Sequence, residues 1–136
     1  MDFILFINFT HLQLKLSLMK RLIIATLSGL LFGFVCFGFA SSGDNEVETW
    51  LALAIISGRL LLGFGIGISR FPMKNWAIHG LVMGVIFSIP AAFGTMMGPE
   101  TPGFDPQMIA ISTVVMGMIY GFLIELITTV FFKAKI

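Results

Sequence analysis

An arginine lies in the middle of a long apolar stretch of this sequence. Arg59 occurs in IISGRLLLGFGIGISR, residues 55–70, with leucine, isoleucine and glycine on both sides. A guanidinium keeps its charge in proteins, and a charge at the centre of a bilayer costs on the order of 3 kcal/mol by insertion measurements. Ionisable side chains at such a depth face a bundle interior and mark ion, proton or solute paths. Arg59 is therefore the first candidate for function.

Two further ionisable residues, Glu125 and His79, also lie in apolar stretches. Residues four apart share one face of a helix, and each of the two charged residues continues a row of glycines with that spacing. The first row consists of Arg59, Gly63 and Gly67, and the second consists of Gly117, Gly121 and Glu125. The spacing therefore predicts that both charges face the packed side of the bundle. Together the three residues form a predicted intramembrane polar site for an anion, a proton or a small polar solute.

The partner of Glu125 can be placed in two ways. Counting back from Lys133 puts Glu125 about 12 Å from the end of its helix, within side-chain reach of Arg59. Alignment of the glycine rows puts it instead at the rim of the bundle, where His79 or Arg70 is the better partner. We favour Arg59 as the counter-ion, with His79 nearby. The alternative to a functional site is a structural ion pair that holds two helices together.

The composition is that of an integral membrane protein. The chain has 136 residues, of which 57% are hydrophobic and 11% charged, and its mean hydropathy is +1.01. Soluble domains carry about 25% charged residues. A net charge of +1 gives no reason to expect nucleic-acid binding. The single cysteine, Cys36, cannot form an internal disulfide, and no metal-ligand spacing occurs. We expect no cofactor, no metal and no catalytic residues, and therefore not an enzyme.

Four stretches are long enough to cross a bilayer, which takes about 20 apolar residues. They predict an all-α, four-helix transmembrane bundle over residues 19–136, with helices at 22–41, 49–69, 75–97 and 108–132. Residues 1–18 form an N-terminal extension whose apolar run is too short to span. Because Met19, Lys20 and Arg21 have the character of a natural start, this extension is either an over-extended start or an interfacial segment, and we expect it to be poorly specified.

The charges outside the spans are sorted by sign. All lysines and the flanking arginines fall on one side of four spans, and the acidic loop residues fall on the other: Lys15, Lys20, Arg21, Arg70, Lys74, Lys133 and Lys135 against Asp44, Glu46, Glu48, Glu100 and Asp105. The positive-inside rule then places both termini in the cytoplasm, with the chain in the inner (cell) membrane. The first helix could also be a cleaved signal peptide, but its apolar run is long for one.

Each predicted helix contains two glycines four residues apart. The pairs are Gly29 and Gly33, Gly63 and Gly67, Gly80 and Gly84, and Gly117 and Gly121. Such small residues let helix backbones approach closely in a lipid environment, where burying leucine gives helices little reason to associate. Helix one aligns with helix three, and helix two with helix four. This favours two parallel repeats of a helical hairpin, related by an axis along the membrane normal.

Two functions fit these features. The first is a small polytopic membrane protein that acts as an oligomeric channel or transporter and uses the Arg59, Glu125 and His79 site. The second is a non-transporting membrane subunit or assembly factor that packs against other helices through its glycine rows. In both cases the expected partners are the lipid bilayer and either further copies of the chain or other membrane proteins.

Overall fold

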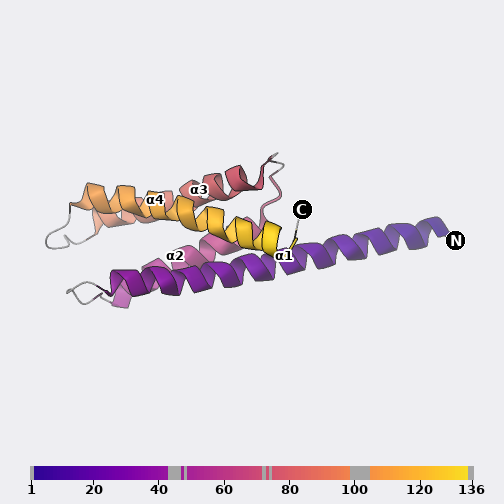
Figure 1. Cartoon of the computed structure of the whole chain (residues 1–136), viewed down its shortest axis with the longest axis horizontal. Coiled ribbons are helices and arrows are strands. Elements are labelled where there is room, and N and C mark those ends of the chain that lie inside the picture. The colour runs from indigo at the N-terminus through magenta and orange to yellow at the C-terminus, as the bar shows by residue number, and fades with distance from the viewer. Residues whose placement is uncertain are drawn as a thin grey trace.

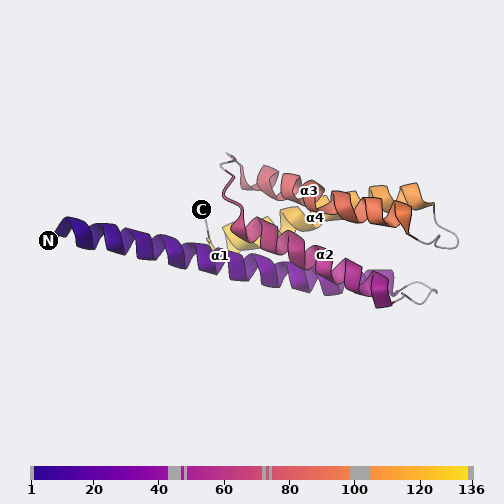
Figure 2. The same ribbon diagram turned by 180° about the vertical axis from the view of Figure 1, so that it is seen from behind.

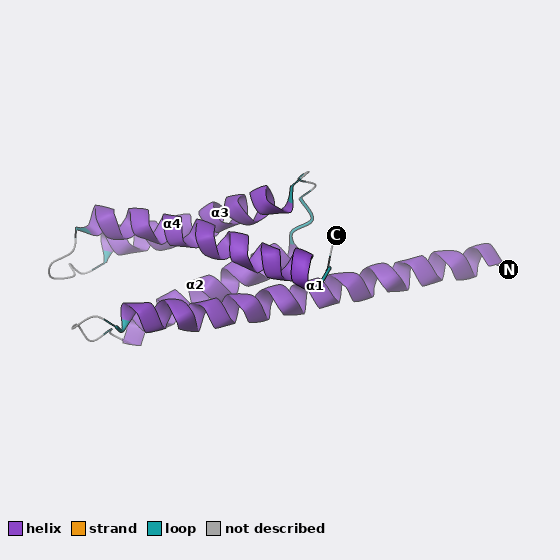
Figure 3. Cartoon of the chain, viewed as in Figure 1, coloured by secondary structure: helices purple, strands orange, loops and turns teal. Residues whose placement is uncertain are grey.

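The computed structural model describes residues 2–42, 47, 49–71, 73, 75–98 and 105–134, with side chains from residue 7 onward. Within these ranges the chain is all α, with no strand (Figure 3). The long helices are α1 (Asp2–Ala40), α2 (Thr49–Ile68), α3 (Trp76–Met97) and α4 (Pro106–Glu125), and α4 continues as a π-helix, η1 (Leu126–Phe131). The predicted all-α class with four apolar helices is confirmed, and each helix is long and apolar enough to cross a membrane.

The starts of α3 and α4 follow directly from the local sequence. The side chain of Asn75 accepts a hydrogen bond from the backbone N–H of Ala77 at 3.2 Å. The side chain of Asp105 does the same for Gln107 at 3.0 Å, and Pro106 follows it in the first turn. Asparagine and aspartate are preferred caps because they satisfy N–H groups that have no partner inside the helix.

α1 begins much earlier than the sequence predicted, at residue 2 instead of residue 22. No proline or glycine occurs before Gly29, so nothing in the sequence interrupts the helix. Its 39 residues extend about 58 Å, whereas the hydrocarbon core of a bilayer is about 30 Å thick. The N-terminal part of α1 therefore projects beyond the other three helices (Figures 1 and 2). Side chains 7–16 are exposed there.

The helices pack as two pairs, α1 with α2 and α3 with α4 (Figures 1 and 2). A Cβ atom added at Gly29 would lie 2.5 Å from the carbonyl oxygen of Arg59 and 2.9 Å from the Cα atom of Gly63. A Cβ atom added at Gly80 would lie 2.6 Å from the carbonyl oxygen of Gly121. The backbones are therefore in direct contact within each pair. All eight glycines predicted from the sequence face the helix with which their own helix pairs.

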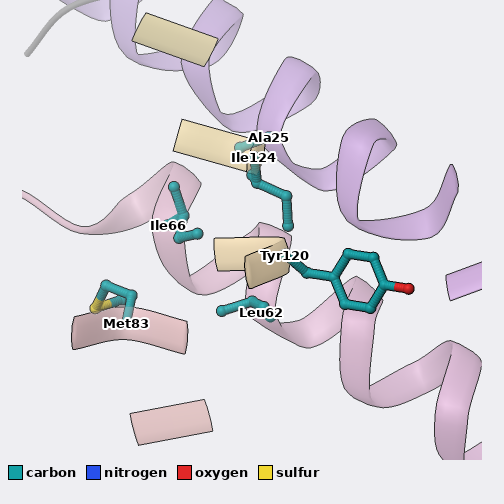
Figure 4. Close-up of a cluster of buried hydrophobic side chains, with 6 residues drawn as sticks. All are labelled: Ala25, Leu62, Ile66, Met83, Tyr120 and Ile124. Carbon is teal, nitrogen blue, oxygen red and sulfur yellow. The ribbon is translucent and has the colours of Figure 1, made fainter. Parts of the chain in front are cut away.

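The hydrophobic core joins the two pairs. It consists of six side chains from all four helices, each at most 8% exposed: Ala25, Leu62, Ile66, Met83, Tyr120 and Ile124 (Figure 4). Toward the other end of the bundle, no residue of α2 before Arg59 is buried. The pairs diverge in that direction, toward Ala40 and Met97 (Figures 1 and 2). Arg59 is the first buried residue of α2 and therefore lies at the edge of the buried part of that helix.

Candidate functional site

A buried ion pair joins the first and last helices. Nη2 of Arg21 lies 2.9 Å from Oε1 and 3.0 Å from Oε2 of Glu125, and the two side chains are 1% and 3% exposed. The sequence placed Arg21 in the basic group that flanks the first span. Because α1 continues past that point, Arg21 instead lies inside the bundle and faces α4. The counter-ion of Glu125 is therefore Arg21.

His79 extends this pair toward α2. Its Nδ1 atom lies 3.2 Å from Oε2 of Glu125, and its Nε2 atom lies 2.8 Å from Oγ of Ser69. The side chain is buried, at 4% exposed. Of the partners considered for Glu125, His79 is in contact with it, whereas Arg70 is exposed and takes no part. Ser69, His79, Glu125 and Arg21 thus form a continuous polar chain.

The π-helix completes the surroundings of the ion pair. The hydroxyl of Thr129 donates to Oε1 of Glu125 at 2.7 Å and accepts from Nη1 of Arg21 at 3.1 Å. Nη1 of Arg21 also donates to the carbonyl oxygen of Ala134 at 3.1 Å. One-turn π segments are frequent at functional sites because they change the direction of side chains and carbonyl groups. Here Ala134 follows the π-helix, and its carbonyl group reaches Arg21.

Arg59 does not join this network, so the predicted pairing of Arg59 with Glu125 is wrong. Both ion pairs in the described part of the chain involve Glu125, and neither includes Arg59. The reason is depth. Glu125 binds Arg21, and the guanidinium of Arg21 also reaches the carbonyl oxygen of Ile66. Ile66 lies seven residues from Arg59, which is about 10 Å along α2.

The neighbours of Arg59 are uncharged. Its Nη1 atom lies 3.5 Å from Oγ of Ser88, and its Cζ atom lies 5.0 Å from the centre of the Tyr120 ring. The residue is 8% exposed, so it faces the bundle as the spacing of four predicted. The interior therefore holds two polar layers: the Arg21–Glu125–His79 layer, and the cation of Arg59 with its hydroxyl and aromatic neighbours.

Three residues of these layers were not predicted from the sequence: Arg21, Ser88 and Thr129. Each nevertheless lies in a row of residues spaced four apart. Arg21, Ala25, Gly29 and Gly33 form a row of four-residue steps, as do Gly80, Gly84 and Ser88, and Glu125 and Thr129. The position of Arg21 beside Lys20 favoured a role at the membrane surface. The row of small residues that follows Arg21 was the signal that it faces inward.

An open groove of about 520 Å³ lies between α2 and α3, near the Ser69 end of the polar chain. It is lined by Gly65, Ile68, Ser69, Arg70, Phe71, Met83 and Phe87. Ser69 contributes to the groove and also contacts His79. The groove therefore adjoins the end of the buried polar chain.

Removal of the Thr129 hydroxyl tests the packing of this site. We expect Thr129→Val to lower the free energy of unfolding by about 1–3 kcal/mol, because valine leaves buried hydrogen-bonding groups of Arg21 and Glu125 without that partner. The matched control is Thr113→Val in α4, where the hydroxyl bonds to the carbonyl oxygen of Ile109 and to no other described residue. Equilibrium unfolding in mixed micelles measures both, and an equal effect of the two variants would contradict the role of Thr129.

The four long apolar helices indicate a multi-pass membrane protein whose polar side chains gather inside the bundle. Comparison with protein-family models, with curated proteins and with solved structures finds no significant match to the chain.

Proposed function

We propose that the chain forms an oligomeric channel or transporter of the inner (cell) membrane, with a polar site inside the bundle. The observation that supports this is the burial of one ionisable side chain from every helix: Arg21 from α1, Arg59 from α2, His79 from α3 and Glu125 from α4. Packing alone does not require charges, since apolar residues of similar volume stabilise a core equally well or better. Charges at membrane depth are by default associated with ion or solute paths.

The arrangement suggests where such a path runs. Within each helix pair the backbones touch, so no solute passes there. The polar side chains lie between the pairs, from Ser69 through His79 to Glu125, with Arg59 further along α2. His79 bonds to Oε2 of Glu125 on one side of its ring and to Oγ of Ser69 on the other, so it joins the two ends of the polar chain. Four helices enclose little space, so a complete path requires more than one copy.

A flux measurement tests the proposal. Liposomes containing the purified protein are challenged in turn with sodium chloride, a pH gradient and urea. We expect Arg59→Gln and His79→Gln to reduce the flux of the transported solute at least tenfold while retaining helix content and oligomer size. Arg70→Gln is the matched control, because this arginine is exposed and lies outside the polar chain. Wild-type flux in both interior variants would refute the proposal.

The second candidate is a non-transporting subunit that packs against other membrane helices through its glycine rows. Its support is weaker, because each of the eight glycines already faces a helix of the same chain. Affinity purification from native membranes distinguishes the two. The chain alone or as a homo-oligomer supports a channel or transporter, and one stoichiometric partner protein supports the subunit.

The two helix pairs are proposed to be copies of one duplicated hairpin. In support, both pairs cross at glycines that correspond in the sequence alignment. The crossings differ by one helical turn: Gly29 faces Gly63, whereas Gly117, which corresponds to Gly63, faces Gly84 and not Gly80. A shift of one turn preserves the facing side of each helix, so it is compatible with divergence after duplication.

We expect both ends of the chain to lie in the cytoplasm. In a Cys36→Ala background, a membrane-impermeant maleimide added outside intact spheroplasts should label Asp105→Cys at least tenfold more than Lys15→Cys or Lys133→Cys. All three side chains are exposed, so accessibility differs only through the bilayer. Opening the membranes should equalise the labelling. External labelling of Lys15→Cys and not of Lys133→Cys would contradict this topology.

A further inference from the structure

We infer that Arg59 forms a binding site for a small monovalent anion of the halide class. The inference rests on the proposed function, because it names the class of solute that the interior site takes. It starts from the charge of Arg59, which no described residue of the chain balances. Only 8% of the residue is exposed, and both described ion pairs belong to Glu125.

Arg59 has few hydrogen bonds. A guanidinium carries five N–H donors. In the described part of the chain one of them is matched, by Oγ of Ser88 at 3.5 Å, which is at the long limit for a hydrogen bond. The ring of Tyr120 lies on one side of the guanidinium, with its centre 5.0 Å from Cζ. These neighbours orient the cation and leave donors available for an acceptor.

Arg21 in the same bundle shows how the charge of a buried guanidinium is balanced by the protein itself, although its Nε atom has no hydrogen-bond partner among the described residues. It bonds to both oxygens of Glu125, to the hydroxyl of Thr129 and to the carbonyl of Ala134. Buried charges in proteins are paired or hold an ion of opposite sign. Since Arg59 has no such set of acceptors, an anion is the group that completes its surroundings.

The surroundings of Arg59 select a small, singly charged anion. One unbalanced positive charge is neutralised by one negative charge, and a divalent anion would leave a net negative charge buried. Oγ of Ser88 and the ring of Tyr120 flank the guanidinium, so the anion must be small enough to lie beside them.

Thermal unfolding at constant ionic strength tests the site. Detergent-solubilised protein in sodium gluconate is titrated with sodium chloride, sodium bromide or sodium sulfate. We expect a saturable rise of the unfolding midpoint with chloride and bromide, because a ligand that binds only the folded state stabilises it. Sulfate should give no saturable rise. A wild-type protein without the halide effect, or with an equal effect of sulfate, would overturn the inference.

Variants locate the effect. Arg59→Gln should lose the halide shift, and the matched control Arg70→Gln should keep it. Ser88→Ala removes the hydrogen bond that orients the guanidinium of Arg59. It should therefore weaken the apparent chloride affinity about three- to tenfold, the change expected for one hydrogen bond. A halide shift that survives in Arg59→Gln overturns the site. If Arg59→Gln does not fold, Ser88→Ala provides the test, and unchanged affinity in that variant overturns it.

Binding and flux separate this inference from the proposed function. Arg59-dependent chloride binding without flux of any tested solute supports the anion site and refutes the channel or transporter. Arg59-dependent flux of urea or protons without halide binding supports the channel or transporter and overturns the anion site.

Discussion

Replacement of Glu125 by alanine is expected to lower the free energy of unfolding by about 3–5 kcal/mol, because it leaves Arg21 as a buried charge without a counter-ion. The guanidinium is 1% exposed, so neither water nor lipid headgroups can replace the carboxylate. His79 and Thr129 lose the same hydrogen-bond partner. Unfolding of the purified protein in mixed micelles by increasing dodecyl sulfate, followed by circular dichroism, measures the change.

A double variant separates the effect of losing the ion pair from the cost of leaving one buried charge unpaired. Arg21→Met combined with Glu125→Leu removes both charges and retains similar volumes. We expect it to be more stable than Glu125→Ala, since replacing a whole buried pair is often neutral or stabilising. Equal destabilisation by the single and double variants would mean that the unpaired charge is not the cause. A change below about 1 kcal/mol in Glu125→Ala would show that the pair is solvated.

The helices could be predicted from the sequence because membrane crossing depends on a local property, the length of an apolar run. The predicted 49–69 and 75–97 agree with α2 and α3 to within one residue at each end. The start of α1 could not be found in this way. Apolar content marks the part of a helix that crosses lipid, whereas the helix itself continues until glycine, proline or a cap ends it.

The inward direction of Arg59 and Glu125 could also be predicted, since a spacing of four defines a helix face. Their partners could not be. The partner of Glu125 depends on how far α1 is displaced along α4 and on the π-helix that returns Ala134 to Arg21. Both are properties of the assembled bundle. No pattern within one helix specifies them.

Two kinds of contact hold the bundle together, and they differ in stiffness. Within each pair, glycines bring backbone against backbone. Between the pairs, contact is made by longer side chains such as Leu62, Met83 and Ile124 and by the Arg21–Glu125 pair. Long side chains can change rotamer while backbones in contact cannot, so the contact between the pairs is easier to rearrange than the contact within each pair.

Gly63→Ala is expected to lower the free energy of unfolding by about 3 kcal/mol, because the new methyl group meets the carbonyl oxygen of Ala25 and neither backbone can move alone. The matched control is Gly58→Ala in the same helix, where nothing lies within 4 Å of the added Cβ atom. That change should stabilise the protein by up to about 1 kcal/mol, since alanine favours a helix over glycine.

The same comparison can be made in the second pair with Gly84→Ala and Gly94→Ala. A Cβ atom at Gly84 would meet the carbonyl oxygen of Gly117, and one at Gly94 would meet nothing within 4 Å. We expect opposite signs for the two variants, as in the first pair. If alanine were tolerated equally at Gly63 and Gly58, and equally at Gly84 and Gly94, the backbones would not be in contact and the stiffness of each pair would have another origin.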